Sequence, residues 1–147
     1  QELKVKLPRP MINSKDFDFS FSGLKTAVMR ETNKLKTMKQ WNNETMRQLA
    51  YEIQESITDV LVKKTLAAAQ QYKVKSILLG GGVAANKRLS EKFNLKIDNL
   101  KFKISLHIPP PSLCTDNASY IGSFAYFHNH PQPWKEINSQ PDLTVEV

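Results

Sequence analysis

Cysteine is almost absent from this 147-residue sequence, in which Cys114 stands alone. A single cysteine excludes an internal disulfide and fits a reducing compartment, so we expect a cytoplasmic location. Long apolar runs are also missing, because no stretch approaches the ~20 residues that a membrane-spanning helix requires, and we expect no membrane association. The start of the chain is too charged for a signal peptide. Its first residue is Gln1 rather than Met, which predicts a fragment of a longer protein.

Acidic residues are in the minority. The chain has 14 Asp and Glu against 21 Lys and Arg, which gives a formal net charge of +7 and an isoelectric point near 9.5. This balance suits a polyanionic partner, although lysine-rich sequences also occur where there is no such partner. The length predicts a single domain, residues 1–147, that is large enough for a hydrophobic core.

Glycine is scarce too, yet three of the five glycines are adjacent, at positions 80–82. The apolar run before them predicts a buried strand over residues 74–79, covered on both faces, and residues 84–93 are rich in helix formers. Glycines let another molecule approach the main chain closely, and the first amides of a helix favour an anionic group. The layout is typical of a nucleotide-binding turn, although neither the dinucleotide fingerprint nor a P-loop is present. The alternative is a tight turn packed on the sheet edge.

The sequence before the glycines predicts one strand and two helices. Phenylalanines alternate with polar residues over residues 17–21, which indicates a strand with one apolar face. Ser22 is the expected N-cap of a helix that ends near residue 36. Apolar residues spaced by threes and fours predict a long helix over residues 43–71.

The C-terminal part predicts a second strand and a last helix. Residues 102–106 alternate again, and the prolines at 109–111 end this strand. Thr115 or Asp116 is the expected cap of the last helix, and the tail over residues 129–147 is expected to be irregular. The helix is expected to bury one apolar side, which consists of Tyr120, Ile121, Phe124 and Phe127. Strands separated by helices favour an α/β fold with a mostly parallel sheet covered by helices.

Four motifs follow one another along the chain. They are Pro8-Arg9-Pro10-Met11, Asp18-Phe19-Ser20-Phe21-Ser22-Gly23-Leu24-Lys25-Thr26, Gly81-Gly82-Val83-Ala84-Ala85-Asn86 and Cys114-Thr115-Asp116-Asn117-Ala118. In this order and at these separations they closely resemble the tRNA adenosine threonylcarbamoyltransferase family, formerly called O-sialoglycoprotein endopeptidases or glycoproteases. The resemblance runs from about residue 8 to about residue 127. It implies the C-terminal lobe of a two-lobed enzyme with an actin/Hsp70-like ATPase (ribonuclease H-like) fold, a mixed sheet flanked by helices.

The resemblance also implies roles for particular residues. Asp116 matches a ligand of the family's catalytic divalent metal, iron or zinc, for which one carboxylate and two imidazoles are a suitable set. Asn86 matches a residue that contacts the adenylate substrate, and Gly81 and Gly82 would line the same pocket. From the residues alone, Asp116 is more simply a helix cap, and Asn86 a helix-surface side chain bonded to its own backbone.

The metal-binding His-x-x-x-His motif of the family is absent from this sequence, since His107, His128 and His130 do not have its spacing. The resemblance implies that a missing N-terminal lobe supplies both histidines and shares the metal with Asp116. Cys114 has no partner base, which favours a small buried side chain over a nucleophile.

Two other sets of residues bear on the comparison with the family. Ser22, Gly23 and Lys25 match their motif, and we interpret them as a helix start rather than as catalytic residues. Ser119 and Tyr120 depart from the family pattern, but they follow the ligand position and leave the metal assignment unaffected.

The reaction implied by the resemblance is transfer of the threonylcarbamoyl group from threonylcarbamoyl-adenylate to the adenosine beside a tRNA anticodon. The implied partners are tRNA, a paralogous lobe-pairing protein and a small ATPase of the same pathway. Without the N-terminal lobe, we expect this fragment to be inactive. Two alternatives remain. One is a metallopeptidase, which follows the old family name although no His-Glu-x-x-His element is present, and the other is a non-catalytic lobe that binds nucleotide or partners.

Overall fold

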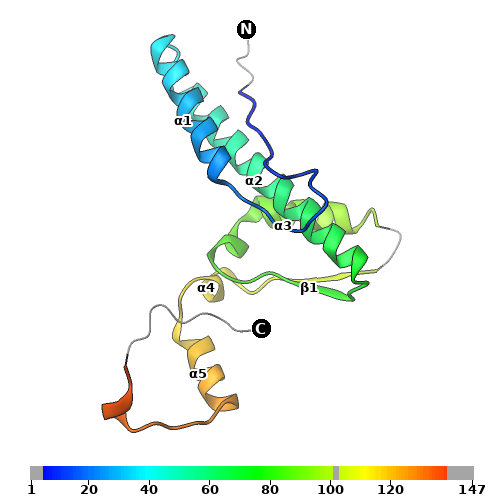
Figure 1. Cartoon of the computed structure of the whole chain (residues 1–147), viewed down its shortest axis with the longest axis vertical. Helices are drawn as coiled ribbons and strands as arrows, with labels where there is room; N and C mark the ends of the chain where they lie inside the picture. Colours follow the sequence, from blue (N-terminus) through cyan, green and yellow to red (C-terminus); the bar gives the residue numbers. More distant parts are fainter. Residues whose placement is uncertain (1–4, 101–102, 139–147) are drawn as a thin grey trace.

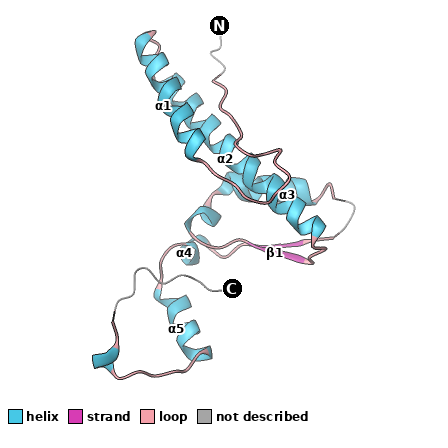
Figure 2. Ribbon diagram, in the orientation of Figure 1, coloured by secondary structure: helices cyan, strands magenta, loops and turns pink. Residues whose placement is uncertain are grey.

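The structure, a computed structural model, describes residues 5–100 and 103–138 (Figure 1). Helices predominate in this part of the chain, and the sheet that it contains is a pair of short strands (Figure 2). None of the described helices is long and apolar enough to cross a membrane. In chain order the elements are α1 (Ser22–Thr37), α2 (Asn43–Gln71), β1 (Ser76–Leu78), the 3-10 turn η1 (Gly82–Ala85), α3 (Lys87–Ile97), β2 (Ser105–His107), α4 (Pro111–Cys114), α5 (Ala118–Phe127) and the 3-10 turn η2 (Trp134–Glu136).

Helices α1 and α2 form an antiparallel hairpin that projects away from the sheet (Figure 1). Leu24 of α1 and Leu49 of α2 are buried in one cluster, together with Leu7 from the N-terminal segment. Asn42 caps α2, because its Oδ1 accepts the Thr45 N–H at 3.0 Å and Thr45 Oγ1 accepts the Asn42 N–H at 3.0 Å. This reciprocal capping box satisfies main-chain donors at the start of the helix.

Strands β1 and β2 lie parallel, with Ile77 opposite Leu106. Parallel neighbours need a crossover connection, and here the chain crosses through η1 and α3. The main core lies between α2, α3 and this sheet, and its buried members are Val62, Ala69, Ile77, Leu89, Phe93 and Ile104. Packing of α3 on α2 therefore determines where the glycines that follow β1 are placed.

The segment before α1 runs along α2 (Figure 1). The Leu7 N–H donates to Glu52 Oε1 at 3.0 Å, and the Ser56 hydroxyl donates to the Pro8 carbonyl. The main chain of this segment is thus held by side chains of a helix and not by a neighbouring strand.

The predicted strand over residues 17–21 is accordingly wrong. No described strand lies beside it, and without a ladder partner an extended segment leaves its main-chain groups unpaired. Phe19, on the expected apolar face, is 53% exposed. Helix α1 closely matches its predicted span, but its N-cap is Phe21, without a side-chain hydrogen bond, and not Ser22.

The strand before the glycines is shorter and more open than predicted. It spans Ser76–Leu78 instead of residues 74–79. Ile77 is buried, whereas Leu78 is 76% exposed, so one face of β1 is uncovered in the described part of the chain. Strand β2 also differs from its prediction over residues 102–106, because it lies at Ser105–His107; Phe102 falls outside the described residues.

Helix α5 stands apart from the main core (Figure 1). Its cap is Asn117, whose Oδ1 accepts the Ser119 N–H at 3.0 Å, so the prediction of Thr115 or Asp116 as the cap is wrong. Periodicity identifies the apolar face of a helix but not whether anything covers it. The side predicted to be buried is 47% to 78% exposed at all four positions, Tyr120, Ile121, Phe124 and Phe127. Residues 128–138 follow as an irregular segment with the turn η2.

Candidate functional site

A pocket of about 450 Å³ lies where the glycine turn meets the segment around α4. We call it the glycine-turn pocket, and its lining residues are Gly81, Gly82, Leu113, Cys114, Thr115, Asp116 and Tyr120. The structure thus brings Gly81 and Gly82 to the same cavity as Asp116, although they are far apart in the sequence. Asn86, the remaining predicted site residue, is not among the lining residues.

The two glycines of the pocket have different reasons to be glycine. Gly81 has a φ of +79°, in the left-handed region that side chains with a Cβ rarely adopt. Gly82 has no such backbone constraint, and a Cβ added there would meet nothing within 4 Å. The turn closes with the Ala84 N–H donating to the Gly81 carbonyl at 3.0 Å. The backbone conformation therefore favours glycine at position 81. At position 82, the lack of a side chain leaves open space in front of the main chain.

Asn86 is the N-cap of α3. Its Oδ1 accepts the Leu89 N–H at 3.1 Å, and its own backbone is extended, which is why α3 begins at Lys87 and not at the predicted residue 84. The side-chain oxygen is occupied by this cap. The side-chain nitrogen makes no hydrogen bond to the described residues, so it remains a donor for a ligand.

Asp116 is held at the pocket by its neighbours in the chain. Cys114 is 3% exposed and its thiol donates to the Pro109 carbonyl at 3.5 Å, which confirms the expected small buried side chain. Asn117 Nδ2 donates to the Thr115 carbonyl at 2.9 Å. Between these two anchored residues, the Asp116 carboxylate is exposed on the pocket. It is free to serve an external ligand because Asn117 performs the capping.

Tyr120 is a site residue that the sequence reasoning missed. Its hydroxyl donates to Asp116 Oδ1 at 3.3 Å. The available signal was closeness in the sequence, since Asp116 lies just before the Asn117 cap and Tyr120 lies in the first turn of α5. The sequence reasoning instead assigned Tyr120 to a buried helix side.

A single carboxylate does not make a metal centre. The described residues contain no group of three or more His, Cys, Asp or Glu side chains that could hold a metal ion. His107 lies in β2, and the His128 ring stacks on Phe124 with 4.4 Å between ring centroids. Asp116 is therefore one candidate ligand, with two carboxylate oxygens of which one accepts from Tyr120.

An ion-pair network joins α3, the helix that follows the glycine turn, to α2. Arg88, near the start of α3, donates to both oxygens of Glu55 on α2, at 2.6 and 3.1 Å. Lys92 contacts Glu55 Oε2 at 3.0 Å and Asp59 Oδ1 at 2.5 Å. Arg88 first, and Lys92 with it, lower the pKa of the Glu55 carboxyl to about 2.

Arg9 extends the same network to the N-terminal segment. Its Nε donates to Asp59 Oδ2 at 3.0 Å, and its guanidinium also pairs with Glu52. Fork-shaped guanidinium contacts of this kind fix orientation as well as position. The arginine of the Pro-Arg-Pro-Met motif, to which the sequence assigned no role, thus ties the segment to α2 and, through Lys92, to α3.

Comparison with known proteins places these residues in a family. A family model described as tRNA N6-adenosine threonylcarbamoyltransferase matches residues 1–123. Relatives that carry this name are 43% identical in Halalkalibacterium halodurans, over 97% of this chain and 41% of the relative, and 47% identical in Geobacillus thermodenitrificans, over 96% of this chain and 41% of the relative. A third, in Persephonella marina, is 43% identical over 97% of this chain and 38% of the relative. The chain therefore spans about two fifths of the length of these curated relatives.

Proposed function

Because this chain belongs to the tRNA N6-adenosine threonylcarbamoyltransferase family, we propose that it forms the C-terminal lobe of a two-lobed enzyme of that activity. The enzyme transfers a threonylcarbamoyl group from threonylcarbamoyl-adenylate to the adenosine beside a tRNA anticodon. The observation that carries the proposal is the glycine-turn pocket, in which Gly81 and Gly82 face Asp116. The actin/Hsp70-like architecture of the lobe belongs to the same proposal, and the parallel β1–α3–β2 unit supports it.

The glycine turn is the proposed adenylate site. The open space before Gly82 lets a ligand approach the main chain, and the Asn86 amide nitrogen supplies a directional donor at the edge of the turn. The ion-pair network through Arg88 and Glu55 holds α3, and with it the turn, against α2. The role of these residues is to orient the adenylate before the reaction.

Asp116 is the proposed ligand of a divalent metal, iron or zinc. Its carboxylate fits this role because it is exposed on the pocket, is not a helix cap and accepts only one hydrogen bond among the described residues. When bound, such a metal supplies Lewis-acid stabilisation of negative charge on the substrate. Two histidines of an N-terminal lobe would complete the ligand set.

The proposed reaction is an acyl-type transfer. The exocyclic amine of adenosine attacks the carbamoyl carbonyl, a carbon–nitrogen bond forms, the bond from that carbon to the phosphate oxygen breaks, AMP leaves, and the amine loses a proton. The role of this lobe is to orient the carbonyl relative to the amine and to help stabilise the negative charge that develops on the carbonyl and the leaving phosphate.

The charge of the helical hairpin supports tRNA as the substrate. Residues 22–47 contain six basic and two acidic residues. The difference, a net charge of +4, is more than half of the formal net charge of +7 of the whole sequence. All six basic side chains are exposed, and Lys36 lies over the Trp41 ring at 5.4 Å from its centroid. Exposed cations with an adjacent aromatic ring suit a nucleic-acid backbone. The basic residues are Lys25, Arg30, Lys34, Lys36, Lys39 and Arg47.

The apolar face of α5 supports a second lobe. Ile121, Phe124 and Phe127 are each more than 60% exposed, and contiguous exposed apolar side chains mark interaction surfaces. We assign this face to contact with the N-terminal lobe. A paralogous lobe-pairing protein and a small ATPase are the proposed pathway partners, in a cytoplasmic setting.

A reconstitution separates the possible activities. The 147-residue chain and a full-length protein that contains it are each given threonylcarbamoyl-adenylate, a tRNA transcript and the metal, and modified adenosine is measured. We expect transfer by the full-length protein only. Metal-dependent cleavage of a glycoprotein without transfer would favour a metallopeptidase, and adenylate binding without either reaction would favour a non-catalytic lobe.

A further inference from the structure

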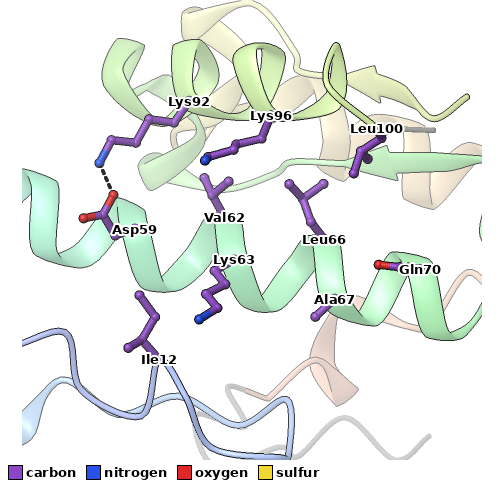
Figure 3. Close-up of a pocket in the computed structure, with 10 residues that line it drawn as sticks. All are labelled: Ile12, Asp59, Val62, Lys63, Leu66, Ala67, Gln70, Lys92, Lys96 and Leu100. Atoms are coloured by element: carbon purple, nitrogen blue, oxygen red, sulfur yellow. Dashed lines mark hydrogen bonds and ion pairs between the residues drawn. The ribbon is translucent and has the colours of Figure 1, made fainter. Parts of the chain in front are cut away.

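A second cavity, of about 460 Å³, lies between α2, α3 and the N-terminal segment, and Asp59 and Lys92 of the ion-pair network line it (Figure 3). We call it the lysine trough. It shares no residue with the glycine-turn pocket. Helix α2 provides its base, α3 one wall and Ile12 of the N-terminal segment the other. Its lining residues are Ile12, Asp59, Val62, Lys63, Leu66, Ala67, Gln70, Lys92, Lys96 and Leu100.

The base of the trough is apolar. Of the α2 residues that line it, Val62, Leu66 and Ala67 form the apolar stripe of the base, and Asp59, Lys63 and Gln70 are polar. Val62 is 3% exposed, and Leu66 and Leu100 pack partly buried against the main core (Figure 3). The small side chain of Ala67 leaves the space above the stripe open. A cavity of this size with an apolar base matches the dimensions of sites for small organic ligands.

The rim of the trough carries an excess of positive charge. Three lysines line it against one carboxylate, that of Asp59, which is already paired with Lys92 at 2.5 Å. Lys63 donates at 2.8 Å to a neutral acceptor, Asn13 Oδ1. Lys96 makes no ion pair with any residue that the structure describes, and it lies one helical turn from Lys92. Lys96 is exposed, and its ammonium is available to an anionic group of a ligand.

We propose that the lysine trough binds a small amphipathic anion, with its aliphatic or aromatic body on Val62 and Leu66 and its anionic end at Lys96. The body and the anionic end are both required by the observations. An inorganic anion alone would leave the apolar base in water, and a neutral apolar ligand would not use the exposed Lys96 ammonium. This inference rests on α2 and α3 and is independent of the proposed transfer reaction.

The test uses 1-anilinonaphthalene-8-sulfonate as an anionic probe and N-phenyl-1-naphthylamine as its neutral analogue, in fluorescence titrations of the 147-residue chain. The exposed face of α5 is a second possible site for both dyes, so all titrations use a background with Phe124→Ser and Phe127→Ser. Lys96→Gln should weaken binding of the anionic probe by about tenfold or more, since it removes a charge-assisted contact. It should leave the neutral probe within about twofold. Lys87→Gln, at the start of α3 and outside the trough, is the matched control and should change neither.

A second test of the proposal fills the trough with a larger side chain. Ala67 is exposed on α2, so Ala67→Leu and Ala67→Trp should fold, which circular dichroism and thermal unfolding verify. Both should reduce binding of the anionic probe by at least about tenfold, because the added side chain occupies the apolar base. Unchanged binding in a folded Ala67→Trp variant would place the probe elsewhere and overturn the proposal. Equal affinity for both probes, with no effect of Lys96→Gln, would show an apolar site only and would overturn it as well.

Discussion

Tyr120 donates a hydrogen bond to the Asp116 carboxylate at 3.3 Å, and both side chains line the glycine-turn pocket. The bond joins the residue just before the Asn117 cap to the first turn of α5, and it constrains one carboxylate oxygen of Asp116. Asn117 caps α5, so the carboxylate of Asp116 has no structural duty at the helix end. Because Asn117 caps the helix, the neighbouring Asp116 is available to a ligand.

Removal of the Asp116 carboxylate should abolish metal retention and transfer in the full-length enzyme but leave the fold stable. Asp116→Ala removes an exposed side chain that is not a cap, so the free energy of unfolding should change by no more than about 0.5 kcal/mol. Asn117→Ala, its neighbour, removes the cap and should cost about 1 kcal/mol. Metal content by elemental analysis, transfer assays and urea unfolding measure the three effects. An Asp116→Ala enzyme that retains metal and activity would show that the carboxylate is not a ligand.

The two glycines of the pocket should respond differently to substitution. A Cβ at position 82 meets no atom of the protein within 4 Å and φ is not in the left-handed region, so Gly82→Val should fold but block the adenylate from approaching the turn. Gly81→Ala forces a Cβ into the left-handed region at φ +79° and should cost about 1–3 kcal/mol of stability. Thermal unfolding and calorimetric titration with a non-hydrolysable adenylate, both in the full-length enzyme, separate the effects. Normal adenylate affinity in Gly82→Val would place the ligand elsewhere.

Asn86 allows its capping and binding roles to be separated by two substitutions. Asn86→Asp keeps an oxygen that caps α3 but loses the amide donor, so stability should be nearly unchanged while adenylate affinity falls by about tenfold. Asn86→Ala loses both and should in addition lose about 1 kcal/mol of stability. The same titrations and unfolding curves test this. If the Asp variant binds the adenylate as tightly as the parent, Asn86 is a cap and nothing more.

Acidification should weaken the contact between α2 and α3. The pKa of Glu55 in the fold is about 2, below its ordinary value of 4.5, so its ion pairs stabilise the fold above that ordinary value. This contribution is lost as the pH falls from about 4.5 through about 2, because the unfolded chain then binds the proton more readily. Glu55→Gln should lower the free energy of unfolding at pH 7 by about 1.5–3 kcal/mol and flatten its decline between pH 5 and pH 3. Urea unfolding across this range is the measurement. The control, Glu136→Gln on the exposed turn η2, should have the same free energy of unfolding as the parent at each pH. If the free energy of unfolding of Glu55→Gln declined as steeply as that of the parent, the acid sensitivity would belong to other groups.

The basic residues of the hairpin should contribute to tRNA affinity in a salt-dependent way. Lys36→Gln with Lys39→Gln removes two exposed cations at the hairpin tip, so the slope of log affinity against log salt should become shallower by about 1.5. The matched control, Lys73→Gln with Lys75→Gln, removes the same charge at the other end of α2 and should change the slope much less. Fluorescence anisotropy with a labelled tRNA and the full-length enzyme provides the slopes. Equal slopes in the two double variants would mean that the hairpin does not contact the tRNA.

Local sequence signals predicted most elements but not their neighbours. The three-and-four spacing of apolar residues predicted α2, and the apolar run before the glycines predicted β1, because a helix, a short strand or a turn depends on residues close in the chain. The N-caps of three helices could also have been predicted from residues close in the chain. Asparagine is among the preferred N-cap residues, and Asn42, Asn86 and Asn117 cap α2, α3 and α5.

The sequence by itself determined the family, through four motifs in order, and the helical character of most of the chain. Only the tertiary structure decided that residues 17–21 do not pair as a strand, that the apolar side of α5 is exposed in the described part of the chain, and that Arg9 joins Asp59 while Arg88 joins Glu55. Strand pairing, burial and ion pairs each require a partner distant in the chain, and no local pattern specifies which partner packing will bring within contact distance. The meeting of Gly82 with Asp116 in one pocket is a consequence of that packing.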